Sequence, residues 1–94
     1  MFNTNSYYEG KVVSLGFDTP EATATVGVMA PGTYEFSTSA REVMTVVTGE
    51  LIVKLPGASD WNTYGPGMSF EVAADQRFGV RVTTNTAYLC LYGG

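Results

Sequence analysis

Glu42 is the first residue in the sequence to suggest chemistry, because it stands among apolar and β-branched neighbours. It begins a run, Glu42–Thr48, that reads as a buried strand. A carboxylate in apolar surroundings is costly unless something pairs with it, and such residues are frequent in active sites. Two interpretations stay open: a functional carboxylate, or a strand-end acid that is solvated or paired with Arg41 or a more distant arginine.

The sequence contains no histidine, which removes most familiar catalytic arrangements. Ser-His-Asp and Cys-His catalysis need that imidazole, which is also the commonest transition-metal ligand. With a single cysteine, Cys90, a zinc site is not credible either, so we expect neither a metal nor another cofactor. Glycine-rich nucleotide loops and EF-hand spacing are also absent. Cys90 lies in the apolar segment Tyr88–Tyr92, which predicts a buried thiol.

Two arginines near a late turn, Arg77 and Arg81, are candidates for holding a small anion such as phosphate. The alternative is that both lie on an exposed strand face, opposite the apolar stripe Phe78-Val80-Val82. Trp61 follows a polar loop and could cover a core edge, a dimer interface or a pocket mouth. The sequence does not choose among these positions.

Several aromatic residues are expected on the strands that carry these groups. Their simplest role is to fill the core, but in a partly open barrel the same rings could stack on a planar ligand. The rings concerned are Tyr34, Phe36, Phe70, Phe78 and Tyr88.

The elements that must position these residues are short strands. Eleven glycines and four prolines in 94 residues favour many turns. Ser39-Ala40-Arg41-Glu42 has the spacing of a helix capping box, but the β-branched run after it limits any helix to one turn. The predicted strands and short extended segments are Tyr7–Leu15 (bent at Gly10), Thr23–Met29, Thr33–Thr38, Glu42–Thr48, Leu51–Leu55, Trp61–Tyr64, Met68–Val72, Arg77–Thr83 and Thr86–Tyr92. About eight or nine short strands predict an all-β barrel or sandwich, with one domain over residues 1–94.

Side chains alternate between the two faces of a strand, which predicts how residues group. Two sets expected to share a face are Ala24, Val26 and Val28 in one strand, and Tyr34, Phe36 and Thr38 in the next.

The net charge of the protein limits the classes of molecule that it can bind. The formal net charge of −4 and a pI near 4.4 argue against a nucleic-acid polymer, whose phosphates need a basic face. A small anion remains possible, because one or two arginines are enough for a single phosphate. No apolar run approaches the roughly 20 residues that span a bilayer, so no membrane partner is expected. The start, MFNTNSYYEGK, lacks the features of a signal peptide, and we expect the protein in the cytoplasm.

The order of turn, strand, glutamate and glycine resembles the first motif of the cupin family, G-x5-H-x-H-x3/4-E-x6-G. Gly32 fits the first glycine and Glu42-x6-Gly49 fits the second half, although the interval to Glu42 is two residues short. Thr38 and Ala40 stand where the two histidines would be.

The second cupin motif is matched in kind by the Gly65-Pro66-Gly67 turn and the strand after it. Phe78 falls near the place of the last histidine. All three metal-binding histidines are therefore missing, which puts the usual metal chemistry of cupins out of reach.

A closer resemblance covers essentially the whole chain. The segments that carry it are YYEGKVVSLGF, VGVMAPGTYEFSTSAREVMTVVTGEL, LPGASDWNTYGPGMSFEV and AYLCLY. They resemble the small bacterial pyrimidine/purine nucleoside phosphorylases, which are single-domain cupins of about this length. The resemblance implies a jelly-roll barrel, a homodimer and metal-independent phosphorolysis. In that reaction a purine or pyrimidine nucleoside and inorganic phosphate, the co-substrate, give the free base and ribose 1-phosphate.

Roles within a phosphorolytic site follow from the chemistry of the residues. Arg77 or Arg81, with Ser37 and Thr38, could hold phosphate. Glu42, the predicted catalytic residue, could bind ribose hydroxyls, stabilise positive charge at C1′, or protonate the departing base if burial raises its pKa. Tolerant stacking of the base would use the aromatic residues Tyr34, Phe36, Phe78 and Tyr88.

Two other functions remain open from the sequence. One is a non-catalytic cupin that binds a nucleoside or sugar. The other is a structural barrel that dimerises, with Glu42 in an ion pair. The apolar, aromatic first and last strands are the expected dimer surface.

Overall fold

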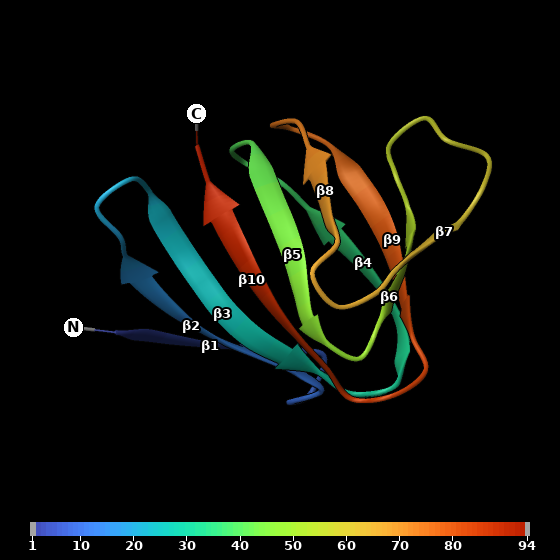
Figure 1. Ribbon diagram of the computed structural model, residues 1–94, viewed down its shortest axis with the longest axis horizontal. Coiled ribbons are helices and arrows are strands. Elements are labelled where there is room, and N and C mark those ends of the chain that lie inside the picture. The colour runs from blue at the N-terminus through green and yellow to red at the C-terminus, as the bar shows by residue number, and fades with distance from the viewer. Residues whose placement is uncertain (1, 94) are drawn as a thin grey trace.

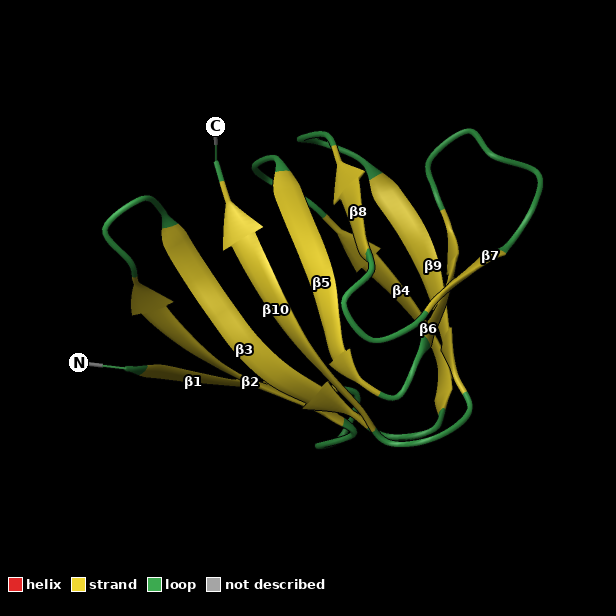
Figure 2. Cartoon of the chain, in the orientation of Figure 1, coloured by secondary structure: helices red, strands yellow, loops and turns green. Residues whose placement is uncertain are grey.

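The computed structural model describes residues 2–93, and over that range the chain forms ten strands and no helix (Figures 1 and 2). The strands are β1 Asn3–Tyr7, β2 Val12–Asp18, β3 Thr23–Met29, β4 Gly32–Ser37, β5 Glu42–Thr48, β6 Leu51–Lys54, β7 Asn62–Tyr64, β8 Ser69–Val72, β9 Arg77–Val82 and β10 Thr86–Tyr92. The predicted all-β fold is confirmed. No helix capable of crossing a membrane occurs in this range.

The strands form two antiparallel sheets that face each other. One has six strands in the order β1-β2-β3-β10-β5-β8, and the other has four in the order β4-β9-β6-β7. In Figure 1 the four-stranded sheet lies at the right, with β4 passing behind β8 of the six-stranded sheet. Each sheet therefore covers the inner face of the other, and β1 and β4 are edge strands.

The prediction of a single bent strand over Tyr7–Leu15 is wrong. It divides into the end of β1, a turn, and the start of β2, which pair as an antiparallel hairpin. The turn depends on three successive residues with positive φ: Tyr8 at 51°, Glu9 at 59° and Gly10 at 85°. Non-glycine residues rarely adopt that conformation, so the sequence signals only a bend at Gly10. This division raises the strand count to ten from the expected eight or nine.

The capping-box spacing before Glu42 does not produce a helix. Glu42 begins β5, in agreement with the prediction from the β-branched run. The next hairpin turns at Gly49, whose φ is 87°. An added Cβ there would also collide with the side chain of Thr86, so only glycine fits.

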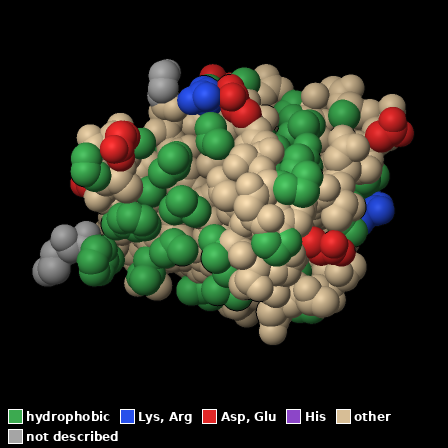
Figure 3. Space-filling model, in the orientation of Figure 1, with side chains coloured by type: hydrophobic (Ala, Val, Ile, Leu, Met, Phe, Trp, Pro, Cys, Tyr) green, Lys and Arg blue, Asp and Glu red, His purple; other side chains and the backbone are tan. Residues whose placement is uncertain are grey.

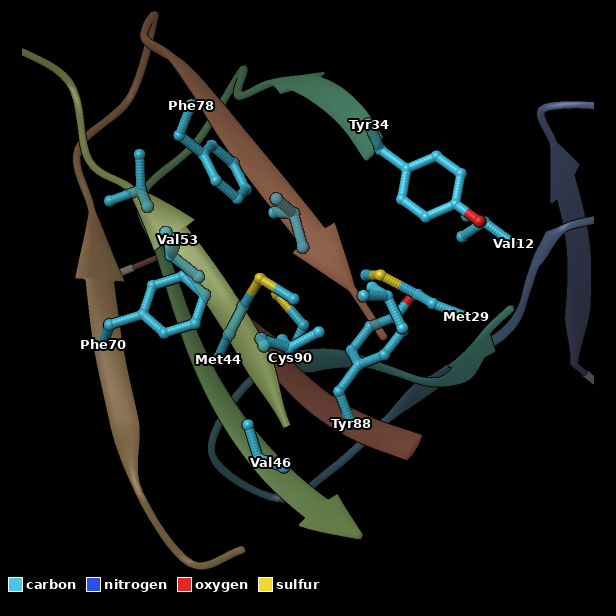
Figure 4. Close-up of a cluster of buried hydrophobic side chains, with 14 residues drawn as sticks. Val12, Met29, Tyr34, Met44, Val46, Val53, Phe70, Phe78, Tyr88 and Cys90 are labelled. Atoms are coloured by element: carbon cyan, nitrogen blue, oxygen red, sulfur yellow. The ribbon is translucent and has the colours of Figure 1, made fainter. Parts of the chain in front are cut away.

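The core fills the space between the sheets (Figure 4). Phe78 from β9 and Tyr34 from β4 converge there with Met44 from β5 and Tyr88 from β10. The predicted stripe of Phe78, Val80 and Val82 is buried as expected. Cys90 is 1% exposed, which confirms the prediction of a buried thiol.

A continuous row of aromatic rings runs through this core. Ring centroids lie 5.0 Å apart for Tyr8–Tyr34, 6.1 Å for Tyr34–Phe36, 5.8 Å for Phe36–Phe78, 6.2 Å for Phe78–Phe70 and 4.8 Å for Phe70–Tyr64. These separations are typical of favourable aromatic pairs. The row begins at the β1–β2 turn and ends at β7 of the four-stranded sheet.

The strand β3 presents its more apolar face to the outside. Val26 and Val28 are 41% and 51% exposed, whereas Met29 is buried between the sheets. On the inner face, the ring of Tyr88 lies over Gly27 too closely for any Cβ. The tyrosine takes the interior volume that a larger residue of β3 would otherwise fill.

The outward side chains of β2, β3 and β10 form three matched rows. The rows are Val13, Val28 and Ala87; Leu15, Val26 and Leu89; and Phe17, Ala24 and Leu91, of which Ala24 is fully buried. We call these nine residues the outer apolar face. All nine are uncharged, and Figure 3 shows apolar atoms gathered over this part of the molecule with charged groups around its rim.

Candidate active site

A cavity of about 600 Å³ opens between the two sheets, where the edge strands β1 and β4 approach each other. A volume of this order accommodates a small organic ligand. Seven strands, the β1–β2 turn and Ser39 contribute to its wall. The lining residues are Asn5, Tyr7, Tyr8, Val12, Ser14, Thr25, Met29, Glu35, Phe36, Ser37, Ser39, Glu42, Met44, Phe78, Tyr88, Cys90 and Tyr92.

The phenol of Tyr8 joins the two sheets at this opening. Its hydroxyl donates to the main-chain oxygen of Glu35 at 2.5 Å and accepts from the Glu35 amide at 3.1 Å. Both groups belong to the edge strand β4. The left-handed conformation of Tyr8 and Glu9 turns the chain so that this phenol reaches across. The turn thus defines one side of the cavity mouth.

Glu42 lies in the wall of the cavity. It stands opposite Tyr92 of β10 on one side and Val72 of β8 on the other. Its Oε1 accepts a hydrogen bond of 3.5 Å from the thiol of Cys90. Burial raises the pKa of the Glu42 carboxyl, and the hydrogen bond from Cys90 lowers it in part. The carboxyl therefore holds its proton to a higher pH than an exposed glutamate does.

Three neutral hydroxyl and thiol groups on β10 line the same cavity as this carboxyl. Burial raises the pKa of Tyr88 to about 12, and burial followed by the charge of Glu42 raises the pKa of Cys90 to about 12. Burial also raises the pKa of Tyr92, whose hydroxyl lies 3.0 Å from that of Thr25. All three groups stay protonated near neutrality. Cys90 therefore acts as a hydrogen-bond donor, because a nucleophilic role requires the thiolate.

The charges around the cavity are unequal. Among its described lining residues are two carboxylates, Glu35 and Glu42, and no lysine or arginine. The cation associated with the opening is Arg77, whose Nη1 lies 3.9 Å from Oε1 of Glu35, both side chains being exposed. Arg77 is also directly opposite Ser37 in the β4–β9 register. Positive charge is thus available at the rim and not within the wall.

Five of the residues predicted for the site come together in the cavity: Phe36, Ser37, Glu42, Phe78 and Tyr88. Tyr34 lies outside the lining. It is buried in the core, and its hydroxyl donates to the carbonyl of Ala30 at 2.5 Å. Thr38 is likewise buried outside the cavity, because its hydroxyl donates to Ala73 O at 2.7 Å and accepts from Gln76 N at 3.0 Å.

Arg81 lies away from the cavity, on the outer face of the four-stranded sheet. Its guanidinium carbon is 4.0 Å from the centroid of the Trp61 ring, a cation–π contact. Trp61 in turn packs against Gly79, where a Cβ would come within 2.9 Å of the indole. Trp61 therefore covers a sheet face and not the cavity mouth.

Several lining residues were not predicted as site residues from the sequence. The main ones are Asn5, Tyr7 and Tyr8 at the N-terminal hairpin and Ser14 opposite Asn5. For Asn5 and Tyr7 the sequence does hold a signal, because residues two apart in a strand share a face. It could not be used, because the strand over Asn3–Tyr7 was itself missed.

The donor groups do not fit a metal centre. Within residues 2–93 no three His, Cys, Asp or Glu side chains are grouped so that they could hold a metal ion. Thr38 and Phe78, which stand at or near positions of the cupin histidines, serve a buried hydrogen bond and the aromatic wall respectively.

Comparisons with known proteins agree with these observations. A family model described as pyrimidine/purine nucleoside phosphorylase matches residues 2–92. A protein of that name from Alcanivorax borkumensis is 57% identical over 93 residues, and the match covers 99% of each chain.

Two solved structures define the fold relationship. A protein of unknown function from Vibrio parahaemolyticus gives a TM-score of 0.95 at 49% identity, with 98% of each chain covered. A cupin domain of a transcriptional regulator from Enterobacter cloacae gives 0.73 at 21% identity, with 89% of this chain and 97% of that chain covered. The second likeness concerns the fold alone. The resemblance found in the sequence is confirmed: the chain has a cupin fold and belongs to the pyrimidine/purine nucleoside phosphorylase family.

Proposed function

We propose that this protein catalyses the phosphorolysis of nucleosides, transferring the pentosyl group from a base to inorganic phosphate. The products are the free base and ribose 1-phosphate. The observation that carries the proposal is that one cavity brings Glu42 together with the rings of Phe36, Phe78 and Tyr88. The family relationship supports the same reaction.

The aromatic wall suits a planar base. The centroids of Phe36 and Phe78 lie 5.8 Å apart at 40°, so the two rings present a tilted apolar surface beside Tyr88. Stacking contributes roughly 1–3 kcal/mol per base and is tolerant of base identity. We therefore propose a broad substrate range that includes both purine and pyrimidine nucleosides.

Glu42 is proposed to act at the sugar. Cleavage of a glycosidic bond passes through an oxocarbenium-like transition state, with positive charge spread over C1′ and the ring oxygen. A carboxylate fixed in an apolar wall stabilises that charge more strongly than it does the neutral nucleoside. The Cys90 thiol holds one carboxylate oxygen, which leaves the other free for the sugar.

Phosphate is proposed to bind at the mouth, between Ser37 and Arg77. These residues are register partners, and the Arg77 guanidinium is exposed and only loosely paired with Glu35. A guanidinium can grip two phosphate oxygens at once. Such a position lets phosphate approach C1′ from the solvent side while the base lies against the rings.

We further propose that the reaction needs no metal or other cofactor. The absence of histidine from the sequence supports this, as does the use of Thr38 and Phe78 for other contacts. The positive charge that a metal would supply to phosphate is assigned instead to Arg77.

The protein is proposed to form a homodimer through the outer apolar face. Val26 stands at the centre of that face and is 41% exposed. Chains with a net charge of −4 repel each other, but this face carries no charge, so two copies can meet there around a two-fold axis. Val26→Lys should give a monomer by light scattering, whereas Thr33→Lys on the other sheet should leave the dimer intact.

We also propose a cytoplasmic location, where nucleosides and inorganic phosphate are both present. Fractionation of cells that carry a tagged copy tests this. Recovery in the periplasmic or membrane fraction would overturn it.

The reaction is tested by incubating the protein with uridine or adenosine and phosphate, and assaying free base and ribose 1-phosphate. Arg77→Ala and Arg81→Ala form a matched pair, because both remove an exposed arginine of β9. Loss of Arg77 should raise the KM for phosphate roughly tenfold or more, while loss of Arg81 should leave it unchanged. Tight nucleoside binding without any release of base would instead indicate a carrier.

A further inference from the structure

The interior of the cavity favours neutral molecules. Its described lining includes the half-buried carboxyl of Glu42 and no lysine or arginine, while the exposed side chains of Glu35 and Arg77 pair with each other at the rim. Like charges repel more strongly where water is partly excluded, so a phosphate dianion is opposed if it moves beyond the rim site and deeper toward Glu42. A water molecule meets no such opposition, and the open mouth gives it access.

Glu42 is equipped to accept a proton. A carboxylate offers about four lone-pair positions, and here the thiol of Cys90 occupies one of them at 3.5 Å. A thiol is a weak donor, so it leaves the carboxylate basic. The raised pKa of the Glu42 carboxyl also brings it nearer to that of an effective general base.

We propose that this protein also transfers the pentosyl group to neutral oxygen nucleophiles, water above all, and so hydrolyses nucleosides when phosphate is scarce. The inference rests on the proposed phosphorolysis, because both reactions use the same cavity and the same oxocarbenium-like transition state. Phosphate and water compete for one electrophilic carbon. Phosphate prevails when it fills the rim site beside Arg77.

The hydrolytic step balances as follows. Glu42 accepts a proton from water as the water oxygen bonds to C1′, and the bond from C1′ to the base nitrogen breaks. The base leaves with the bonding electron pair and takes a proton from solvent at that nitrogen. Glu42 then returns its proton to solvent. The net change is nucleoside plus water giving ribose plus base.

The experiment compares product formation with and without phosphate. In phosphate-free buffer we expect free base together with an equal amount of free ribose. Glu42→Gln should lower this rate by roughly a hundredfold, the scale of general-base catalysis. Glu71→Gln, an acid outside the cavity that pairs with Arg41, should leave it unchanged. With methanol present, the wild-type protein should also form a methyl riboside. Glu42→Gln should form little of this product.

The outcomes separate the two proposals. Base release with phosphate but none above the uncatalysed rate without it would overturn the inference and leave the phosphorylase standing. Release that is equal in the wild type and in Glu42→Gln would also overturn it. If base is released under neither condition, the proposed function itself fails. Far-UV circular dichroism of each variant shows that a lost rate is not lost folding.

Discussion

The thiol of Cys90 donates a hydrogen bond to Oε1 of Glu42 across the β5–β10 ladder, at a sulfur–oxygen distance of 3.5 Å. Both groups lie in the wall of the same cavity. The bond favours the ionised carboxylate and opposes the effect of burial on its pKa. Cys90 is therefore a positioning residue for Glu42.

Replacing Cys90 by alanine should shift the pH dependence of activity. Because the hydrogen bond lowers the pKa of Glu42, its loss raises that pKa further, and the acidic limb of the kcat/KM profile moves to higher pH. Cys90→Ser keeps a hydrogen-bond donor to Glu42 and should move the acidic limb less than Cys90→Ala does. Identical limbs in all three proteins would show that the thiol does not act on Glu42.

Glu42→Gln should make the protein more stable at neutral pH. The folded-state pKa of Glu42 lies above its unfolded value, so the native state binds more protons between the two, and stability falls as pH rises through that window. Below both pKa values the charge penalty is absent. Thermal melts should show a higher Tm for Glu42→Gln at pH 7 and a smaller difference near pH 3. A difference independent of pH would contradict this.

Gly27→Ala should disturb both the fold and the site. An added Cβ would lie 2.8 Å from the carbonyl oxygen of Val13 and against the phenol of Tyr88, so the ring must move within the cavity. Overpacking of this kind costs about 1–3 kcal/mol. Gly16→Ala is the control, because its Cβ meets nothing closer than 3.7 Å. Urea unfolding and nucleoside KM together test this, and equal effects of the two variants would refute it.

Thr38→Val should weaken the fold while leaving nucleoside and phosphate KM unchanged. The buried hydroxyl donates to Ala73 O and accepts from Gln76 N, so its removal leaves main-chain groups without a partner at a cost of about 1–3 kcal/mol. Thr33→Val, at an exposed position of β4, should change stability little. A large rise in phosphate KM for Thr38→Val would show that Thr38 takes part in binding phosphate.

The strand pattern was largely predictable from the sequence. β3 and β10 match their predicted bounds, because apolar alternation between clear turn residues is a strong local signal. The division between β1 and β2 was not predictable, since left-handed conformations at Tyr8 and Glu9 have no clear local signature.

The candidate site was predictable only where it depends on a single strand. Glu42, Phe36 and Phe78 could be proposed from alternation alone. Asn5 and Ser14 reach the cavity through the pairing of β1 with β2, which no local pattern reveals. The same limit applies to Arg81, whose contact with Trp61 joins residues twenty positions apart.

The hydrogen bonds of Tyr8 have a consequence for aggregation and exchange. An edge strand normally offers its free amides and carbonyls to any other extended chain. In β4 the phenol of Tyr8 fills both main-chain positions of Glu35, at the middle of that edge, as a neighbouring strand would. The Glu35 amide should therefore exchange with deuterium slowly for an edge position. Tyr8→Phe should expose β4 to strand addition and so to fibrils.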